Sequence, residues 1–133
     1  MKYSHLILSL FFFAFASLTY AQEPTEMQQV IDIHDEVMER MPTLGKLIHK
    51  LKPLADTTEE GETYQKAIDD LKASNTTMIN WMQGLGERFT ADEMLKGKAL
   101  SKEKEEWLIE ERKKIEALKE QTNSSIQQAE KLL

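Results

Sequence analysis

The feature that most constrains the fold is the recurrence of apolar residues at every third or fourth position in three separate stretches of the chain. Because an α-helix repeats every 3.6 residues, this spacing gathers the apolar side chains on one helical face and leaves the charged residues on the other. The apolar seams run from Met27 to Leu51, from Tyr64 to Leu85 and from Trp107 to Leu132. No stretch has the alternation of a strand. The pattern predicts an all-α protein of the helical-bundle or coiled-coil type.

Capping motifs predict where the helices begin. Three threonines are each followed, three positions later, by Glu or Gln, which is the spacing of a capping box. The pairs are Thr25 with Gln28, Thr57 with Glu60, and Thr90 with Glu93. The third pair predicts only a short helix over residues 91–96, because Gly97 follows it. Ser101 is the expected cap of the last helix.

Proline and glycine predict where the helices bend or end. Pro42 lies inside the first apolar stretch, where its missing N–H and its ring disfavour a helix by about 3 kcal/mol. We therefore expect a kink near Met41, or two short helices that meet there. Gly84 and Gly86 are expected to end the second helix, because glycine adopts the left-handed conformation that terminates many helices.

Three long amphipathic helices with short connections are expected to pack side by side in alternating directions. The predicted fold is an antiparallel three-helix (up-down-up) bundle with a short extra helix in the second connection. One end of such a bundle contains the start of the first helix, the end of the second and the start of the third. Asn75 falls on the apolar seam of the second helix, where it either fixes the helix register or meets water near the end of the bundle.

The N-terminus has the pattern of a secretory signal peptide. Lys2 precedes an apolar run from Leu6 to Leu18, and small residues follow. This order predicts cleavage between Ala21 and Gln22, so residues 1–21 are interpreted as the signal peptide. The apolar run is too short to span a bilayer. We therefore expect a protein exported to the periplasm or secreted, without stable membrane insertion after cleavage.

The remaining domain, residues 22–133, is acidic. Cleavage removes Lys2 from the 17 basic residues, so 16 basic side chains stand against 23 acidic ones and the formal charge is −7. Nucleic acids and anionic membranes bind basic surfaces, so neither is an expected partner. The chain has no cysteine, which excludes a disulfide framework and a thiolate metal site.

One set of side chains has the residue types of a soft-metal site. His34 and Met38 are four positions apart, as are Met78 and Met82, so each pair projects from one face of its helix. A hairpin that turns near residue 56 places His34 level with Met78. Thioethers and an imidazole suit Cu(I). The alternative, which we favour, is that the methionines fill gaps in the core and that His34 bonds to a neighbour.

The aromatic residues are predicted to gather at one end of the bundle. The same folding rule places Trp81 near Trp107, and Phe89 follows in the connection. These side chains either close the end of the bundle or receive a helix from an unknown protein partner.

The sequence offers no recognisable catalytic or cofactor-binding residues. His34, Asp35 and Glu36 are consecutive, and consecutive residues diverge by about 100° around a helix, so these three side chains cannot converge on one ion. Neither a Gly-rich phosphate loop nor a serine hydrolase motif is present. We therefore expect a protein that is not an enzyme.

Four segments stand out once the helices are laid out along the chain. They are Ile33-His34-Asp35-Glu36-Val37-Met38, Ala67-Ile68-Asp69-Asp70-Leu71, Met78-Ile79-Asn80-Trp81-Met82, and Asn123-Ser124-Ser125-Ile126 before Ala129-Glu130. In these segments the mature chain resembles, over essentially its whole length, a family of uncharacterised secreted bacterial proteins labelled viral A-type inclusion protein. The resemblance implies no biochemical activity and no assigned site. Members of the family often carry an N-terminal lipobox cysteine; because this chain has none, a free periplasmic protein is expected.

Three functions are compatible with these observations. The first is an exported, non-enzymatic helical bundle that binds another protein or acts as a scaffold in the cell envelope. The second is a periplasmic Cu(I)-binding protein that uses His34, Met38, Met78 and Met82. The third is a chaperone-like protein for misfolded envelope proteins. Because no catalytic chemistry is recognisable, we favour the first.

Overall fold

The computed structural model describes residues 24–133. The predicted signal peptide and its cleavage after Ala21 lie outside these described residues. Within them the chain forms four α-helices and one short 3₁₀ helix, with no strand. The elements are α1 (Glu26–Leu51), the 3₁₀ helix η1 (Lys52–Leu54), α2 (Glu59–Arg88), α3 (Ala91–Leu95) and α4 (Lys102–Lys131). The prediction of an all-α fold is confirmed.

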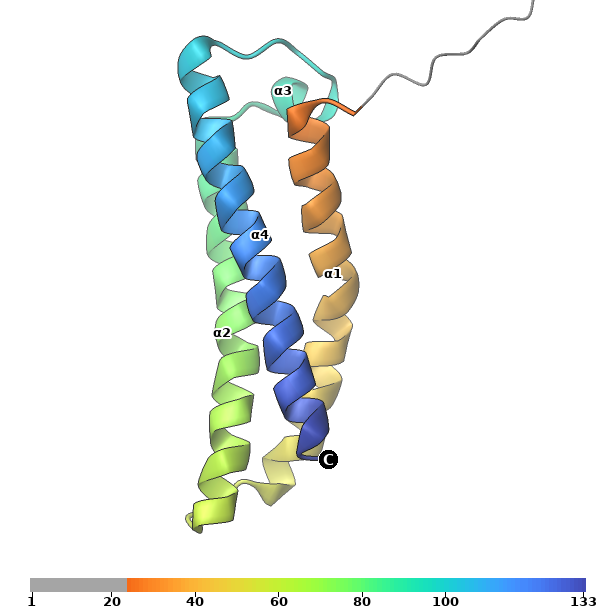
Figure 1. Cartoon of the computed structure of the whole chain (residues 1–133), viewed down its shortest axis with the longest axis vertical. Helices are drawn as coiled ribbons and strands as arrows, with labels where there is room; N and C mark the ends of the chain where they lie inside the picture. Colours follow the sequence, from red (N-terminus) through yellow and green to blue (C-terminus); the bar gives the residue numbers. More distant parts are fainter. Residues whose placement is uncertain (1–23) are drawn as a thin grey trace, which may run out of the picture.

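The three long helices lie lengthwise against one another, and α4 packs against both α1 and α2 (Figure 1). In the view of Figure 1, α1 and α4 run downward and α2 runs upward, so the C-terminus lies at the same end as η1. The short helix α3 and its connections cross the opposite end, which we name the α3 end. The α3 end therefore contains the first turns of α1 and α4 and the last turn of α2.

Two apolar clusters fill the interior. The cluster nearer the α3 end contains Met27, Val30, Val37, Met78, Trp81, Leu85, Phe89, Leu108, Ile115 and Leu118. The other cluster contains Leu44, Leu47, Leu51, Ala67, Ile68, Leu71, Ile126 and Ala129. Because all of these side chains are buried, removal of apolar surface from water is the main force that holds the helices together.

Two serines allow α2 and α4 to approach closely. The Ser125 hydroxyl donates to the Gln121 carbonyl at 2.8 Å and lies 3.2 Å from the buried Ser74 hydroxyl, which is also 3.2 Å from the Asp70 carbonyl. Both hydroxyls are therefore satisfied away from water. The expectation that Asn75 lies on the seam of α2 is wrong, because Asn75 is exposed and its neighbour Ser74 takes the buried position.

Pro42 does not divide the first helix. α1 is continuous from Glu26 to Leu51, so the expectation of two short helices that meet at Met41 is wrong. Proline removes one hydrogen bond to the carbonyl four residues earlier, which here belongs to Met38. Because Pro42 and Met38 are both exposed, water can bind this carbonyl and the helix continues.

Three of the predicted caps are confirmed. The hydroxyls of Thr25, Thr90 and Ser101 each accept the backbone N–H three residues further on, at 3.1 to 3.3 Å. Thr90 and Glu93 form a complete capping box, because the Glu93 carboxylate accepts the Thr90 backbone N–H at 2.8 Å. Gln28 does not complete a box at Thr25, since its side-chain amide donates to another residue of α1.

α2 begins one residue later than predicted. Thr58, and not Thr57, is the cap, and its hydroxyl accepts the Gly61 N–H at 3.1 Å. The Asp56 carboxylate fixes this position because it accepts the Thr58 backbone N–H at 2.9 Å. A Cβ atom on residue 61 would lie 2.5 and 2.7 Å from backbone atoms of Asp56. The close approach of the connection to α2 therefore requires glycine at position 61.

The prediction that glycines end α2 is wrong. The helix continues through Gly84 and Gly86 to its C-cap at Phe89. Neither glycine has a positive φ, and among the described residues only Gly97, after α3, has one (68°). Leu85 and Phe89 are buried, so the packing of their side chains favours continuation of the helix over termination at the glycines.

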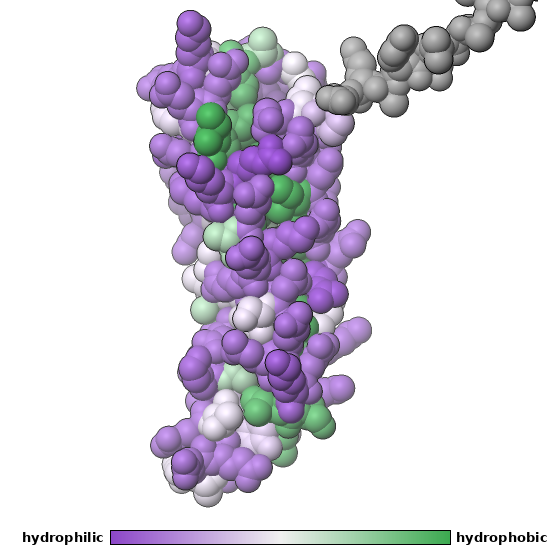
Figure 2. All heavy atoms as spheres, in the orientation of Figure 1, coloured by the Kyte–Doolittle hydropathy of each residue, from purple (hydrophilic) through white to green (hydrophobic). Residues whose placement is uncertain are grey.

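The surface shown in Figure 2 is largely hydrophilic, with apolar atoms near both ends of the bundle. The large apolar side chains that remain exposed are Met38, Leu54, Ile79, Met82, Leu95, Ile109 and Leu133. Among residues 24–133, no helix combines the length and the apolar character needed to cross a membrane.

Candidate functional site

The imidazole of His34 packs on Trp81, between α1 and α2. The two ring centroids are 5.7 Å apart and the ring planes are inclined by 26°. The His34 side chain is 17% exposed, so most of the ring is removed from water. The sequence placed His34 level with Met78, and the structure places it against a residue three positions further along α2, a difference of less than one helical turn.

The two ring nitrogens of His34 have different surroundings. Nδ1 lies 2.8 Å from Oδ1 of Asp35. Because an ionised carboxylate only accepts hydrogen bonds, Nδ1 donates, and the neutral ring keeps its lone pair on Nε2. Nε2 is buried and has no hydrogen-bond partner among the described residues. This nitrogen is therefore an available electron-pair donor inside the bundle.

The three methionines of the predicted metal set have different environments. Met78 is 1% exposed and belongs to the same core cluster as Trp81. Met38 and Met82 are 40% and 45% exposed. Met38 follows His34 by one turn on the same face of α1, and Met82 adjoins Trp81 in α2. One thioether thus lies in the core and two lie at the surface.

Acidic and histidine side chains do not form a metal cluster in the part of the chain that the structure describes. No three His, Asp or Glu side chains gather closely enough there to hold an ion. His49 is exposed near the end of α1.

The three aromatic residues predicted to face a partner differ in accessibility. Trp81 and Phe89 are 6% and 3% exposed. Trp107 is half-buried, and the Arg88 guanidinium carbon lies 5.5 Å from its ring centroid. Trp81 donates from Nε1 to the Glu111 carbonyl at 3.3 Å, one helical turn from Trp107. Trp81 and Phe89 thus stabilise the interior and present little surface to a partner.

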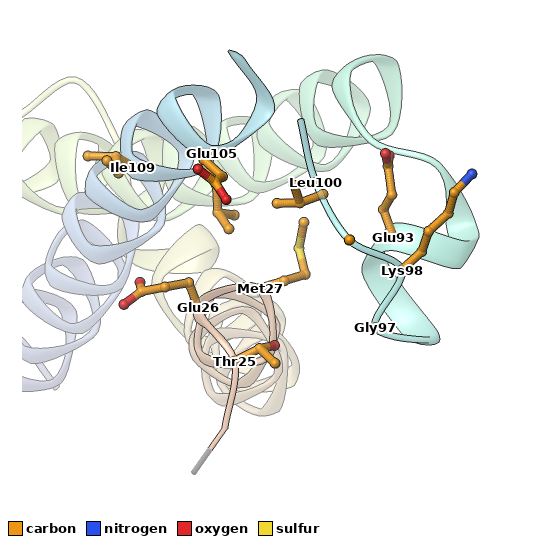
Figure 3. A pocket seen from close by; sticks show the side chains of 11 residues that line it. Thr25, Glu26, Met27, Glu93, Gly97, Lys98, Leu100, Glu105 and Ile109 are labelled. Carbon is orange, nitrogen blue, oxygen red and sulfur yellow. The ribbon is translucent and has the colours of Figure 1, made fainter. Parts of the chain in front are cut away.

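An apolar groove opens at the α3 end, between the first turns of α1 and α4 and the connection that follows α3 (Figure 3). We name it the α3-end groove. Its volume is about 540 Å³. Met27 and Leu100 point toward each other across it, and Leu108 and Ile109 line it from α4. Ile109 is 58% exposed, so part of the apolar lining is open to water.

The sequence patterns did not single out this groove. Ile109 directly follows the seam residue Leu108, and Leu100 directly precedes the cap Ser101. One signal in the sequence could have indicated the groove. A large apolar residue lies beside the apolar face of a helix, where the core of the bundle does not need one. Leu95 of α3, which is 74% exposed, is another residue of this kind.

The rim of the α3-end groove is acidic. Glu26 and Glu105 line it, whereas the amine of Lys98 points away from it (Figure 3). Glu26 pairs with Arg112 of α4 at 2.6 Å, which links the first turn of α1 to α4. An apolar lining with an acidic rim fits an apolar segment that also carries basic residues.

An ion pair fixes one wall of the α3-end groove. Both carboxylate oxygens of Glu93, which is 7% exposed, accept from the Lys104 ammonium, at 2.7 and 2.9 Å. The hydrogen bonds from Lys104, followed by the backbone bond from Thr90, lower the pKa of the Glu93 carboxyl from 4.5 to about 2. The pair ties α3 to α4 and thereby holds the connection that borders the groove.

Comparison of the chain with models of protein families, with curated proteins and with solved structures found no match in any of the three. The likeness to the viral A-type inclusion protein family therefore stays an expectation from the sequence. Two features of the structure can carry a function: the His34 ring beside Trp81 and the α3-end groove.

Proposed function

We propose that the mature chain is an exported, non-enzymatic protein of the cell envelope, folded as an antiparallel three-helix (up-down-up) bundle, that binds a partner protein through the α3-end groove. The signal-peptide pattern of the sequence supports export. The observation that carries the proposal is the exposed apolar lining of the groove, above all Ile109.

The size and lining of the α3-end groove suit an apolar segment of a partner. Its volume of about 540 Å³ lies within the range of about 300 to 1,000 Å³ that is usual for binding sites. Met27, Leu100 and Ile109 come from three different parts of the chain, so they offer contacts to several successive apolar side chains of a docked helix. Binding would remove this lining from water, which favours association.

The expected partner segment is an amphipathic helix with basic residues beside its apolar face. Glu105 on the rim would attract such residues, and the net charge of the domain would speed their encounter. A second copy of this chain is disfavoured as the partner, because a symmetric contact would bring two acidic rims together.

The proposal is tested by photo-cross-linking in cells that export the protein. A photoreactive phenylalanine analogue replaces Ile109 in one version of the protein and Ile79 in a matched control. Ile79 is also an isoleucine in the middle of a long helix and is 56% exposed, against 58% for Ile109, so the two positions differ mainly in the surroundings that they sample.

We expect one defined adduct from position 109, no such adduct from position 79, and loss of the adduct when Leu100→Asp places a charge in the groove. Equal cross-linking from both positions, or none from position 109, would contradict binding through the groove. A broad ladder of adducts from position 109 would favour the chaperone-like function instead.

A further inference from the structure

The buried Nε2 of His34 is not accounted for by helix packing or by the α3-end groove. A buried acceptor without a partner is unfavourable compared with an apolar side chain of the same size. Nε2 has no hydrogen-bond partner among residues 24–133, although the ring is otherwise well held by Trp81 and Asp35. A nitrogen in this state suits a ligand that accepts an electron pair.

Asp35 prepares the ring for such a ligand. In metal sites, a coordinating histidine usually donates its other N–H to a carboxylate, which fixes the tautomer and the orientation of the ring. The Asp35 carboxylate lies 2.8 Å from Nδ1 of His34 and has this relationship to it. The lone pair of Nε2 is thereby held inside the bundle.

The soft donors on the two helices that meet at the His34–Trp81 contact include the thioethers of methionines in α1 and α2. Met78 is buried in the core cluster that also contains Trp81, and Met38 is one turn from His34 on the same face of α1. Methionine has three rotatable bonds, so the exposed side chains of Met38 and Met82 can reorient without movement of the helices. Sulfur donors with an imidazole select Cu(I), whereas Mg²⁺ and Ca²⁺ require oxygen donors.

We propose that Nε2 of His34 and the thioether of Met78 bind one soft monovalent ion, Cu(I) or Ag(I), between α1 and α2. Met38 and Met82 pass the ion inward from the surface and complete its coordination. Trp81 covers the ion with the face of its indole. This site is separate from the α3-end groove, so it does not depend on the function proposed there.

The test is an anaerobic titration of the purified mature protein with Cu(I), in competition with a chromogenic Cu(I) chelator. A Trp107→Phe background makes Trp81 the only tryptophan, so its fluorescence reports on the site itself. We expect binding of one equivalent of Cu(I) with parallel quenching of Trp81 fluorescence, and the same stoichiometry with Ag(I).

Four variants separate ligation from packing. His34→Gln and Met78→Leu are each expected to weaken Cu(I) binding by roughly tenfold or more, and Asp35→Asn by about tenfold through the orientation of the ring. Met94→Leu, a methionine of α3 packed against the same cluster, is the matched control and should bind as the parent does. Far-UV circular dichroism checks that each variant is folded.

Asp35 is 67% exposed, so Asp35→Asn keeps the fold even if a change at His34 or Met78 does not. Parent-like affinity in His34→Gln or in Asp35→Asn would overturn the proposal. So would a loss of affinity in Met94→Leu equal to that in Met78→Leu, since the effect would then follow from core packing and not from coordination.

Discussion

Trp81 and His34 face each other with their ring centroids 5.7 Å apart, and this stacked contact joins α1 to α2. The same indole donates from Nε1 to the Glu111 carbonyl of α4 at 3.3 Å. Trp81 therefore contacts both of the other long helices from one buried position. Substitution of Trp81 should therefore lower the stability of the whole bundle, and not only that of α2.

Trp81→Phe is expected to lower the free energy of unfolding by about 1 to 3 kcal/mol. The change removes the hydrogen bond to Glu111 and leaves a small cavity in the core. Urea unfolding followed by far-UV circular dichroism measures it. Trp107→Phe, at a half-buried position, should cost less than about 1 kcal/mol. Equal losses in the two variants would contradict the central position assigned to Trp81.

Leu71→Ala is expected to destabilise the protein by about 2 to 5 kcal/mol, because Leu71 is fully buried in the cluster away from the α3 end. Leu54→Ala is the matched control, since Leu54 is 42% exposed in η1 and should change stability by no more than about 0.5 kcal/mol. Thermal and urea unfolding of both variants measure the difference. A similar small effect in both would show that Leu71 is not in the core.

Two Gly→Ala substitutions should have opposite signs. Gly45→Ala adds a Cβ into open space inside α1 and is expected to stabilise the protein by about 0.4 to 1 kcal/mol. Gly61→Ala should destabilise it, because the new Cβ would lie 2.5 and 2.7 Å from backbone atoms of Asp56. The urea concentrations at the unfolding midpoints show whether each substitution raises or lowers the stability. If alanine at position 61 stabilises the protein as much as alanine at position 45, the backbone of Asp56 does not pack against the start of α2.

The carboxyl of Glu93 should make stability depend on pH in acid. Its pKa is about 2 in the folded protein, below the ordinary value of 4.5 that applies after unfolding. The carboxylate therefore stabilises the fold above about pH 4.5, and this stabilisation is lost as the pH falls from about 4.5 toward 2. Thermal unfolding at several values between pH 6 and pH 2.5 follows the loss.

Glu93→Gln is expected to lower the thermal unfolding midpoint at pH 6. The midpoint should also fall less steeply in acid than it does in the parent, because glutamine does not titrate. Glu106→Gln, at an exposed position of α4, is the control and should leave the decline as in the parent. If Glu93→Gln and the parent lose stability in parallel down to pH 2.5, the ion pair with Lys104 does not form.

Local signals in the sequence predicted the helix starts better than the helix ends. Thr25, Thr90 and Ser101 cap their helices because a hydroxyl acts on a backbone N–H only three residues away. The end of α2 was mispredicted at Gly84 and Gly86, because packing of distant parts of the chain against Leu85 and Phe89 favours a longer helix. A glycine ends a helix only where the backbone turns to positive φ.

The spacing of residues predicted which side chains share a face, but not how deeply each is buried. Met78 and Met82 are four positions apart, yet one is 1% exposed and the other 45%. Met78 belongs to the core cluster, whereas Met82 remains at the surface of α2, so the apolar spacing of α2 is wider than the face that the other helices cover. The α3-end groove was missed for a related reason: it is formed by a connection whose path the helical pattern does not specify.

The register of α1 against α2 underlies the metal proposal and the packing of the core, and one measurement tests it directly. Two-dimensional NOE spectra of the mature protein should show cross-peaks between the ring protons of His34 and the indole protons of Trp81, whose centroids are 5.7 Å apart. Absence of these cross-peaks, with His34 as accessible to solvent as His49, would contradict the register and the buried donor nitrogen together.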